Sequence, residues 1–202
     1  MDQPKPPREW AIVRAQFQAE PPQRDDIMCL LGETITAWNN LESLARSALR
    51  WLYGHPTAID ALTAELTAEG LANALSAAAQ LIAPDGIRED VLFLAYEMDR
   101  LRPYRNDIVH GAHSPGWSGD QSGIRVSKKT AKGHIKVYDT VVSAYELYLV
   151  KEAIIQLGLH AADVGISLLA HHSAGKPLGP AQKRAFPTLY LRAHQKVPPH
   201  HR

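Results

Sequence analysis

The side chains best suited to chemistry lie within residues 101–111, whose sequence is LRPYRNDIVHG. Arg105 carries a permanent positive charge and a planar fork of donors that matches phosphate oxygens. His110 can accept or donate a proton near neutral pH, and Asn106 can orient a neighbouring group through its amide. RNA cleavage without a metal needs a base for the 2′-hydroxyl, an acid for the leaving 5′-oxygen and positive charge on the transition state. These three residue types fit that chemistry.

An amphipathic helix must position these groups. Leu94, Met98 and Leu101 recur at helical spacing, and Arg105 follows Leu101 by four residues on the same stripe. Gly111 is suited to the left-handed conformation that ends a helix. A guanidinium on a core-facing stripe is costly unless it is paired or opens into a cleft. The helix therefore predicts a partner or a ligand for Arg105.

The spacing within the motif limits what one helix can assemble. Five residues separate Arg105 from His110, which places them about 140° apart around an ideal helix. Asn106 and His110, four residues apart, share a face. A complete site therefore requires Arg105 to reach around the helix, a bend near Pro103, or a second copy of the motif from another subunit.

The segment Arg105-Asn106-x-x-x-His110-Gly111 resembles the signature of HEPN domains, in which an arginine and an adjacent polar residue precede a histidine. The resemblance implies an all-helical fold and, in active members, a metal-independent endoribonuclease whose cleft forms between two protomers of a homodimer. Its products would carry a 2′,3′-cyclic phosphate. Other members are non-catalytic modules for dimerisation and for binding RNA or protein. A toxin or defence role, with an antitoxin or other protein partner, follows from the same resemblance.

Two acidic residues are candidates for a supporting role. Glu42 falls among the apolar residues of an earlier predicted helix and needs a cation there. Arg105 is one candidate, and Arg46, four residues after Glu42, is the other; the sequence leaves both open. Asp107 is an auxiliary candidate beside the motif. In the alternative structural interpretation, Arg105 only neutralises Glu42 and His110 only caps its helix.

Basic charge is concentrated in two parts of a chain whose formal net charge is +1. Residues 100–138 contain eight Lys and Arg against two Asp and Glu, and residues 172–202 contain six Lys and Arg with no acid. A basic surface around the motif would attract a polyanion such as RNA, although charge runs are commonly no more than solvated surface. The candidates for nucleic-acid binding are Arg102, Arg125, Lys128, Lys129, Lys132 and Lys136.

Apolar periodicity predicts an all-α fold, an up-and-down bundle of four to five helices. A small β-hairpin insertion, about residues 113–138, is predicted between the last two long helices, with strands at 124–126 and 135–138. Residues 113–123 read as a Gly/Ser/Pro-rich loop. Pro103 must bend or divide its helix. The predicted helices cover residues 25–53, 57–66, 67–82, 88–110 and 139–171.

The helical domain, residues 24–172, is predicted to lie between a Pro-rich arm, residues 1–23, and a basic Pro-rich tail, residues 173–202. The last long helix is apolar nearly all round, which predicts a central position or a subunit interface. Because residues 141–159 contain four charged or amide side chains, a core helix is expected and not a membrane span.

Composition excludes several classes of site. Cys29 is the single cysteine, so neither an internal disulfide nor a C-x-x-C metal pair can form. No Gly-rich phosphate loop, H-E-x-x-H or G-x-S-x-G motif occurs. We therefore expect no metal and no cofactor. The start of the chain lacks the apolar run of a secretory signal, and a cytoplasmic protein with no membrane partner is expected.

Overall fold

A computed structural model describes residues 14–15, 26–54, 57–110, 112–118, 121–131, 135–175 and 186–187. For most strand residues and for His110, the description covers the backbone alone.

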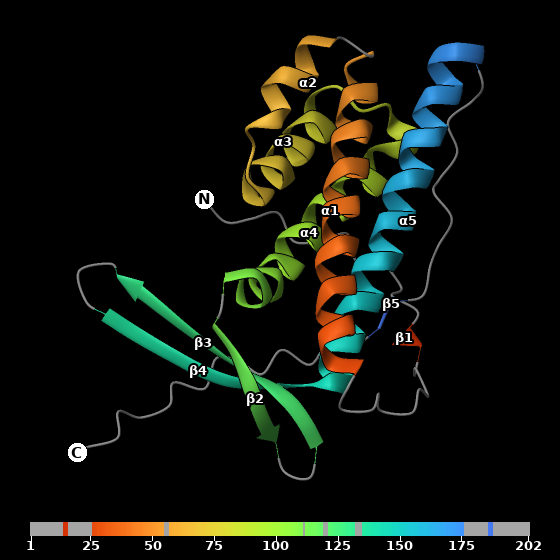
Figure 1. Cartoon of the computed structure of the whole chain (residues 1–202). Helices are drawn as coiled ribbons and strands as arrows, with labels where there is room; N and C mark the ends of the chain where they lie inside the picture. The colour runs from red at the N-terminus through yellow and green to blue at the C-terminus, as the bar shows by residue number, and fades with distance from the viewer. Residues whose placement is uncertain are drawn as a thin grey trace.

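The predicted all-α bundle is confirmed. The described residues contain five helices: α1 (Asp26–Leu52), α2 (Thr57–Ala64), α3 (Ala68–Leu81), α4 (Asp85–His110) and α5 (Ala144–Ala174). Within the described residues, α1 and α5 lie side by side in the same direction, while α4 runs the opposite way (Figure 1). The Lys151 ammonium lies 2.9 Å from the Glu33 carboxylate and joins the first halves of α5 and α1. The shorter helices α2 and α3 sit beside α1 and α4.

One continuous hydrophobic core joins α1, α3, α4 and α5, because each of these helices contributes an apolar stripe at helical spacing. The short helix α2 buries only Thr63. Trp38 of α1 is only 1% exposed. On α5 the buried stripe alternates steps of three and four residues along the whole helix. The largest fully buried side chains are Trp38, Leu41, Leu71, Leu75, Ile87, Leu94, Met98, Leu101, Leu147, Ile154, Leu157 and Leu168.

The predicted hairpin is present, but the insertion is larger than expected. It contains β2 (Ala112–Ser118), β3 (Gln121–Ala131) and β4 (Ile135–Ser143), paired antiparallel in the order β2-β3-β4. The prediction of a loop at residues 113–123 was therefore wrong. Pro115 is tolerated because β2 lies at the edge of the described sheet, where one side of a strand needs no ladder partner.

The start of α5 also differs from the prediction of residue 139, because residues 139–143 pair with β3. Ser143 then caps the helix: its hydroxyl accepts from the Glu146 amide, and the Glu146 carboxylate accepts from the Ser143 amide. This capping box satisfies two amides that the first helical turn leaves without partners. The helix therefore begins where the ladder ends.

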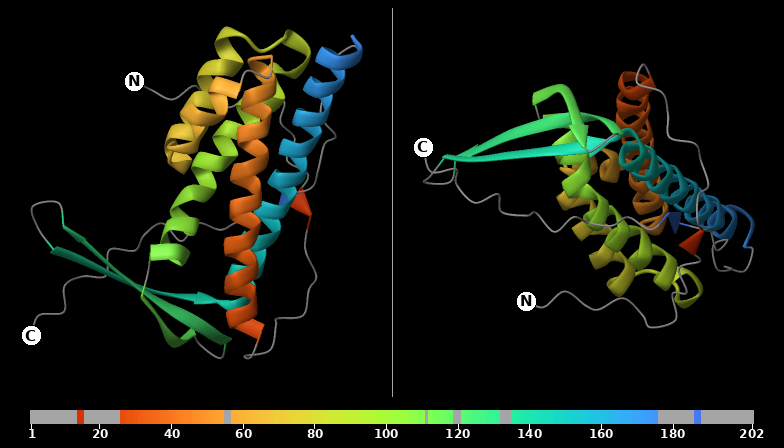
Figure 2. Two further views of the ribbon diagram at one scale, coloured as in Figure 1. Left: turned by 45° about the horizontal axis from the view of Figure 1, so that its top comes forward. Right: turned by 90° about the horizontal axis from the view of Figure 1, so that it is seen from below.

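Pro103 lies inside α4, which continues from Asp85 to His110. The final turns of the helix point away from the direction of the rest (Figure 2). A proline lacks the amide proton of the helical ladder and crowds the preceding turn, which accounts for a bend. Of the two predicted outcomes, α4 is bent and not divided.

The first and the last described strands of the chain pair with each other. Arg14–Ala15 (β1) pairs in parallel with Phe186–Pro187 (β5), and β5 contacts α5. The remaining predictions for the arm and tail lie outside the described residues.

By length and composition alone, α5 could also cross a membrane. Core helices of soluble proteins pass the same test, and the buried stripe of α5 packs against α1.

Candidate functional site

The last turns of α4 hold all three residues of the motif. Arg105 and Asn106 are partly buried, and the Arg105 Nη1 donates to Asn106 Oδ1 over 3.2 Å. Asn106 and His110 are four residues apart on the same helix and therefore occupy the same face. The Arg105 guanidinium is thus held against the amide of the neighbouring residue. Which of the three routes to a complete site applies stays a prediction, because the His110 side chain lies outside the described residues.

His110 is the last residue of α4, and its side chain lies outside the described residues. The backbone places it at the junction with β2, which begins at Ala112. Asp107 is partly buried on the adjacent turn. Asp107 lies two residues after Arg105 and three before His110. Its supporting role stays a prediction.

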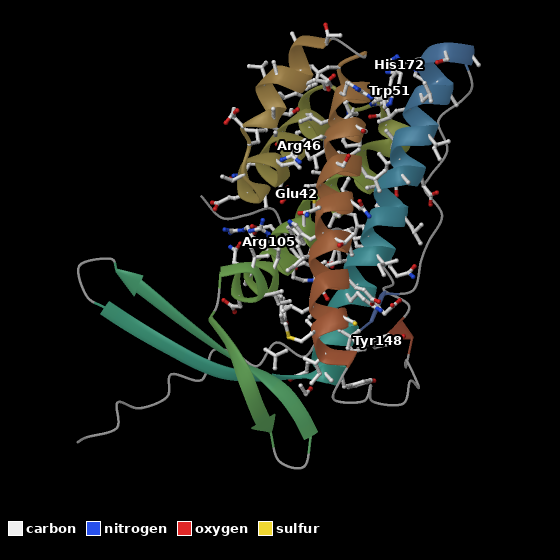
Figure 3. All side chains as sticks on the ribbon, viewed as in Figure 1. Glu42, Arg46, Trp51, Arg105, Tyr148 and His172 are labelled. Carbon is white, nitrogen blue, oxygen red and sulfur yellow. The ribbon has the colours of Figure 1, made fainter. Side chains whose placement is uncertain are left out.

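Glu42 contacts Arg46, the second of its two candidate partners. Glu42 Oε2 lies 3.4 Å from Arg46 Nη1, and Glu42 Oε1 accepts a 2.6 Å hydrogen bond from the indole Nε1 of Trp38. Figure 3 shows Glu42 and Arg46 together on α1, with Arg105 on α4. The carboxylate thus serves a buried indole and a neighbouring cation. Of the two alternatives that the sequence left open, the structure has the pairing with Arg46 and not the one with Arg105.

Arg46 has a structural function beyond this pair. Its Nε donates to the carbonyl of Thr63 and its Nη2 to the carbonyl of Leu66, both over 3.2 Å. These carbonyls lie at the end of α2 and in the connection to α3, where helical carbonyls need donors from elsewhere. Arg46 therefore fastens α1 to the α2–α3 connection.

Tyr104 is the residue that sequence reasoning missed. Its hydroxyl oxygen is buried and has no hydrogen-bond partner in the described part of the chain. Burial raises the pKa of Tyr104, the Arg100 charge opposes this rise and the Glu146 carboxylate adds to it. No local pattern reveals this environment, because it depends on the packing of α4 near the first turn of α5. Tyr104 immediately precedes Arg105 in the sequence.

The candidate residues for nucleic-acid binding are not all equivalent. Arg102 of α4 is already neutralised: its guanidinium lies 2.8 Å from the Glu69 carboxylate and 3.0 Å from that of Asp99. This pair joins α4 to α3. The arginine side chain remains 29% exposed, so a phosphate would have to compete with two carboxylates.

The basic strand positions fall on both faces of the β3–β4 ribbon. Lys136 pairs with Thr130, two residues after Lys128, whereas Arg125 and Lys129 have the opposite parity along β3. Register therefore places Lys128 and Lys136 on one face and Arg125 and Lys129 on the other. Lys132 lies outside the described residues.

The part of the chain that the structure describes contains no cluster of three His, Cys, Asp or Glu residues able to hold a metal ion. Comparison of the chain with protein families, with curated proteins and with solved structures finds no match.

Proposed function

We propose that this chain is a metal-independent endoribonuclease of the HEPN type, with Arg105, Asn106 and His110 at its centre. The observation that carries the proposal is the 3.2 Å hydrogen bond from the Arg105 guanidinium to the Asn106 amide. It holds a permanent cation against Asn106, which by its spacing shares a helix face with His110. A phosphate at this face would meet both a forked donor and an imidazole from one chain.

Each residue has a distinct role in the proposed reaction. His110 accepts the proton of the ribose 2′-hydroxyl, and the 2′-oxygen attacks phosphorus. The bond from phosphorus to the 5′-oxygen breaks, and that oxygen receives a proton from the imidazolium or from water. Arg105 stabilises the charge on the phosphorane-like transition state, and Asn106 orients Arg105. The products are a 2′,3′-cyclic phosphate and a 5′-hydroxyl.

The proposal is tested by incubating single-stranded and structured RNA with the full chain in EDTA. We expect cleavage by the wild type and at least a hundredfold loss in His110→Ala and Arg105→Ala, the loss typical for a proton-transfer or charge-stabilising group. Arg105→Lys keeps the charge but loses the fork, so its activity should fall between these limits. Arg50→Ala and His171→Ala are matched controls on other helices.

Folding must be measured on the same samples, because a guanidinium on α4 can also support structure. Circular dichroism and thermal melts of Arg105→Ala should match those of the wild type within a few degrees. Absence of EDTA-resistant cleavage in the folded wild type would contradict the nuclease proposal. Full activity in folded His110→Ala would contradict the assigned base.

A non-catalytic RNA-binding module is the second candidate, and the insertion favours it. β2 pairs with β3 only as far as Ser127, so residues 128–131 and 135–138 form a two-stranded end of the sheet. In the sequence, residues 128–138 contain four lysines and no acid. RNA binding without cleavage would favour this function. An antitoxin or other protein partner, and a cleft shared by two protomers, stay predictions.

A further inference from the structure

The two faces of the three-stranded sheet carry different residues. Lys128 lies directly opposite Tyr138, so the two residues occupy one face. Lys136 lies two residues before Tyr138 on β4 and occupies the same face, because strand positions alternate between faces. The register thus places two lysines and a tyrosine together on one face of the sheet, hereafter the Tyr138 face.

The opposite face of the sheet lacks this combination. Among the described strand residues it holds Arg125 and Lys129, but it holds no aromatic residue. It also holds Asp139, which pairs with Ser127. The described strand positions of the Tyr138 face include no acidic residue. In the described sheet, basic and aromatic residues therefore occur together, without an opposing carboxylate, on the Tyr138 face alone.

This combination of residue types fits a single-stranded nucleic acid. Sites for single strands place cations along the phosphate backbone and aromatic side chains against the bases. In a duplex, each base is already stacked between its neighbours, and recognition depends on the backbone and the grooves instead. An aromatic residue among lysines therefore favours a strand whose bases are free to stack.

The Tyr138 face begins beside the motif. Ala112 is the first residue of β2 and pairs with Ser127, and Lys128 is the next residue along β3. His110 precedes Ala112 by two residues, so their Cα atoms lie within about 8 Å of each other. β3 also contacts α4. Figures 1 and 2 show β3 and β4 extending from the end of α4 away from the helices, so a strand bound along them is led to the motif.

The packing of the sheet on the bundle separates Tyr138 from a second aromatic position. Val142 lies on the Tyr138 face and packs against the hydrophobic core. It forms one row across the sheet with Ile124 and Pro115. Trp117 occupies the same face beyond this row, whereas Tyr138 lies on the side where β2 begins. Tyr138 is therefore the aromatic residue on the side of the motif.

We propose that the Tyr138 face binds single-stranded RNA, with a base stacked on Tyr138 and phosphates bound by Lys128 and Lys136. The choice of RNA over DNA rests on the proposed nuclease, whereas the choice of face rests on the strand register. Binding should tolerate different sequences, because every base has a surface that can stack. The substrate of the proposed reaction is thus an unpaired strand.

The test measures the affinity of the full chain for a labelled single-stranded 2′-O-methyl RNA, which lacks the attacking hydroxyl and cannot be cut. Tyr138→Val should lower the affinity about 5- to 100-fold, because it removes the stacking partner of a base. The slope against salt concentration should not change, because no charge is lost. Tyr138→Phe retains a ring and should retain the affinity.

A matched double variant tests the face itself. Val137→Tyr combined with Tyr138→Val moves the tyrosine to the opposite face without changing the composition, and both residue types favour strands. Its affinity should stay as low as that of Tyr138→Val, with an unchanged circular dichroism spectrum. A duplex of the same sequence should bind more weakly than the single strand to the wild type. Wild-type affinity in folded Tyr138→Val, recovery in the double variant, or a preference for the duplex would overturn the proposal.

Cleavage of ordinary RNA separates this proposal from the nuclease. Binding that depends on Tyr138, without any cleavage by the wild type, would contradict the nuclease and support the Tyr138 face. If the wild type cuts RNA, Tyr138→Val should raise KM for single strands by the same factor by which it lowers affinity, with little change in kcat. Cleavage with an unchanged KM in Tyr138→Val would support the nuclease and overturn the assignment of this face.

Discussion

At the scale of single residues, Glu42 shows how one carboxylate is shared. Its two oxygens serve the Trp38 indole and the Arg46 guanidinium, and Trp38 is almost fully buried. Glu42→Ala should lower the free energy of unfolding by about 2–3 kcal/mol, because it leaves a buried indole N–H without an acceptor. Glu42→Gln keeps an acceptor and should cost about half as much. Urea unfolding measures both values.

A double-mutant cycle then separates the two candidate partners of Glu42. We expect a coupling energy of about 0.5–1 kcal/mol between Glu42 and Arg46, as for a partly buried contact pair. Glu42 and Arg105 should show coupling near zero, because no contact joins them. A larger coupling to Arg105 than to Arg46 would contradict the arrangement described here.

Tyr104 gives the second prediction at this scale. At neutral pH, Tyr104→Phe should be neutral or raise the free energy of unfolding by about 0.5–1 kcal/mol, because it removes a buried hydroxyl without a partner. The raised pKa of Tyr104 sets the pH dependence. Its contribution is complete below the unfolded pKa, about 10, and is lost as pH rises through the folded value.

The alkaline loss of stability should therefore be steeper in the wild type than in Tyr104→Phe. Urea unfolding between pH 8 and 11 compares the two slopes. Tyr53→Phe serves as the control, because Tyr53 is 47% exposed. Equal slopes for wild type and Tyr104→Phe would show that burial does not hold this hydroxyl protonated.

At the scale of elements, the capping box at Ser143 decides where α5 begins. Ser143→Ala removes the hydroxyl that accepts from the Glu146 amide and should lower the free energy of unfolding by about 1 kcal/mol. Ser143→Asp retains an acceptor at the same position and should recover most of the loss. Ser173→Ala, at the exposed end of the same helix, is the matched control. An unchanged stability for Ser143→Ala would contradict the assigned cap.

The elements that sequence alone predicted best are those specified by local spacing. The helices α1 and α3 begin and end within two residues of the predicted limits. Their apolar periodicity and the turn residues that end them are both read from a short stretch of neighbouring sequence. β2 was missed because its strand character comes from pairing with β3, not from its own Gly, Ser and Pro residues. The apolar end of β4 was likewise assigned to α5.

In the candidate site, too, sequence alone predicted the features set by local spacing and not those set by contacts between helices. The helix and an irregularity at Pro103 follow from residues 101–110, but the sequence did not decide between a bend and a division and did not predict the contact between Arg105 and Asn106. The partner of Glu42 could not be chosen, because Arg46 satisfies the helical spacing and Arg105 satisfies the demand of a buried charge. The environment of Tyr104 depends on α5, more than forty residues later in the chain, and no local pattern encodes it.

At the scale of the whole molecule, positive charge is concentrated in two parts of the chain. The net charge is +1, but residues 100–138 carry a net +6 and residues 172–202 another +6, so the rest of the chain carries −11. A nearly neutral protein arranged in this way can still bind a polyanion, because the field near the basic segment is what an approaching RNA meets. The β3–β4 end of the sheet should therefore control RNA affinity.

This view gives a quantitative prediction for RNA binding. The logarithm of the affinity for single-stranded RNA should fall linearly with the logarithm of salt concentration, with a slope of about 0.7 for each phosphate contact. Lys128→Gln with Lys136→Gln removes two charges from one face of the ribbon and should reduce the slope by about 1.4. Fluorescence anisotropy between 50 and 300 mM salt measures both slopes.

Two matched variants make the result specific. Arg125→Gln with Lys129→Gln removes two charges from the other face, so a smaller change in slope than for the first pair would identify the face that contacts RNA. Lys151→Gln removes a charge on α5 that is already paired with Glu33 of α1, so it should leave the slope unchanged. A slope that neither ribbon pair alters would move the RNA contacts away from the insertion, because counterion release counts only the phosphates that these lysines neutralise.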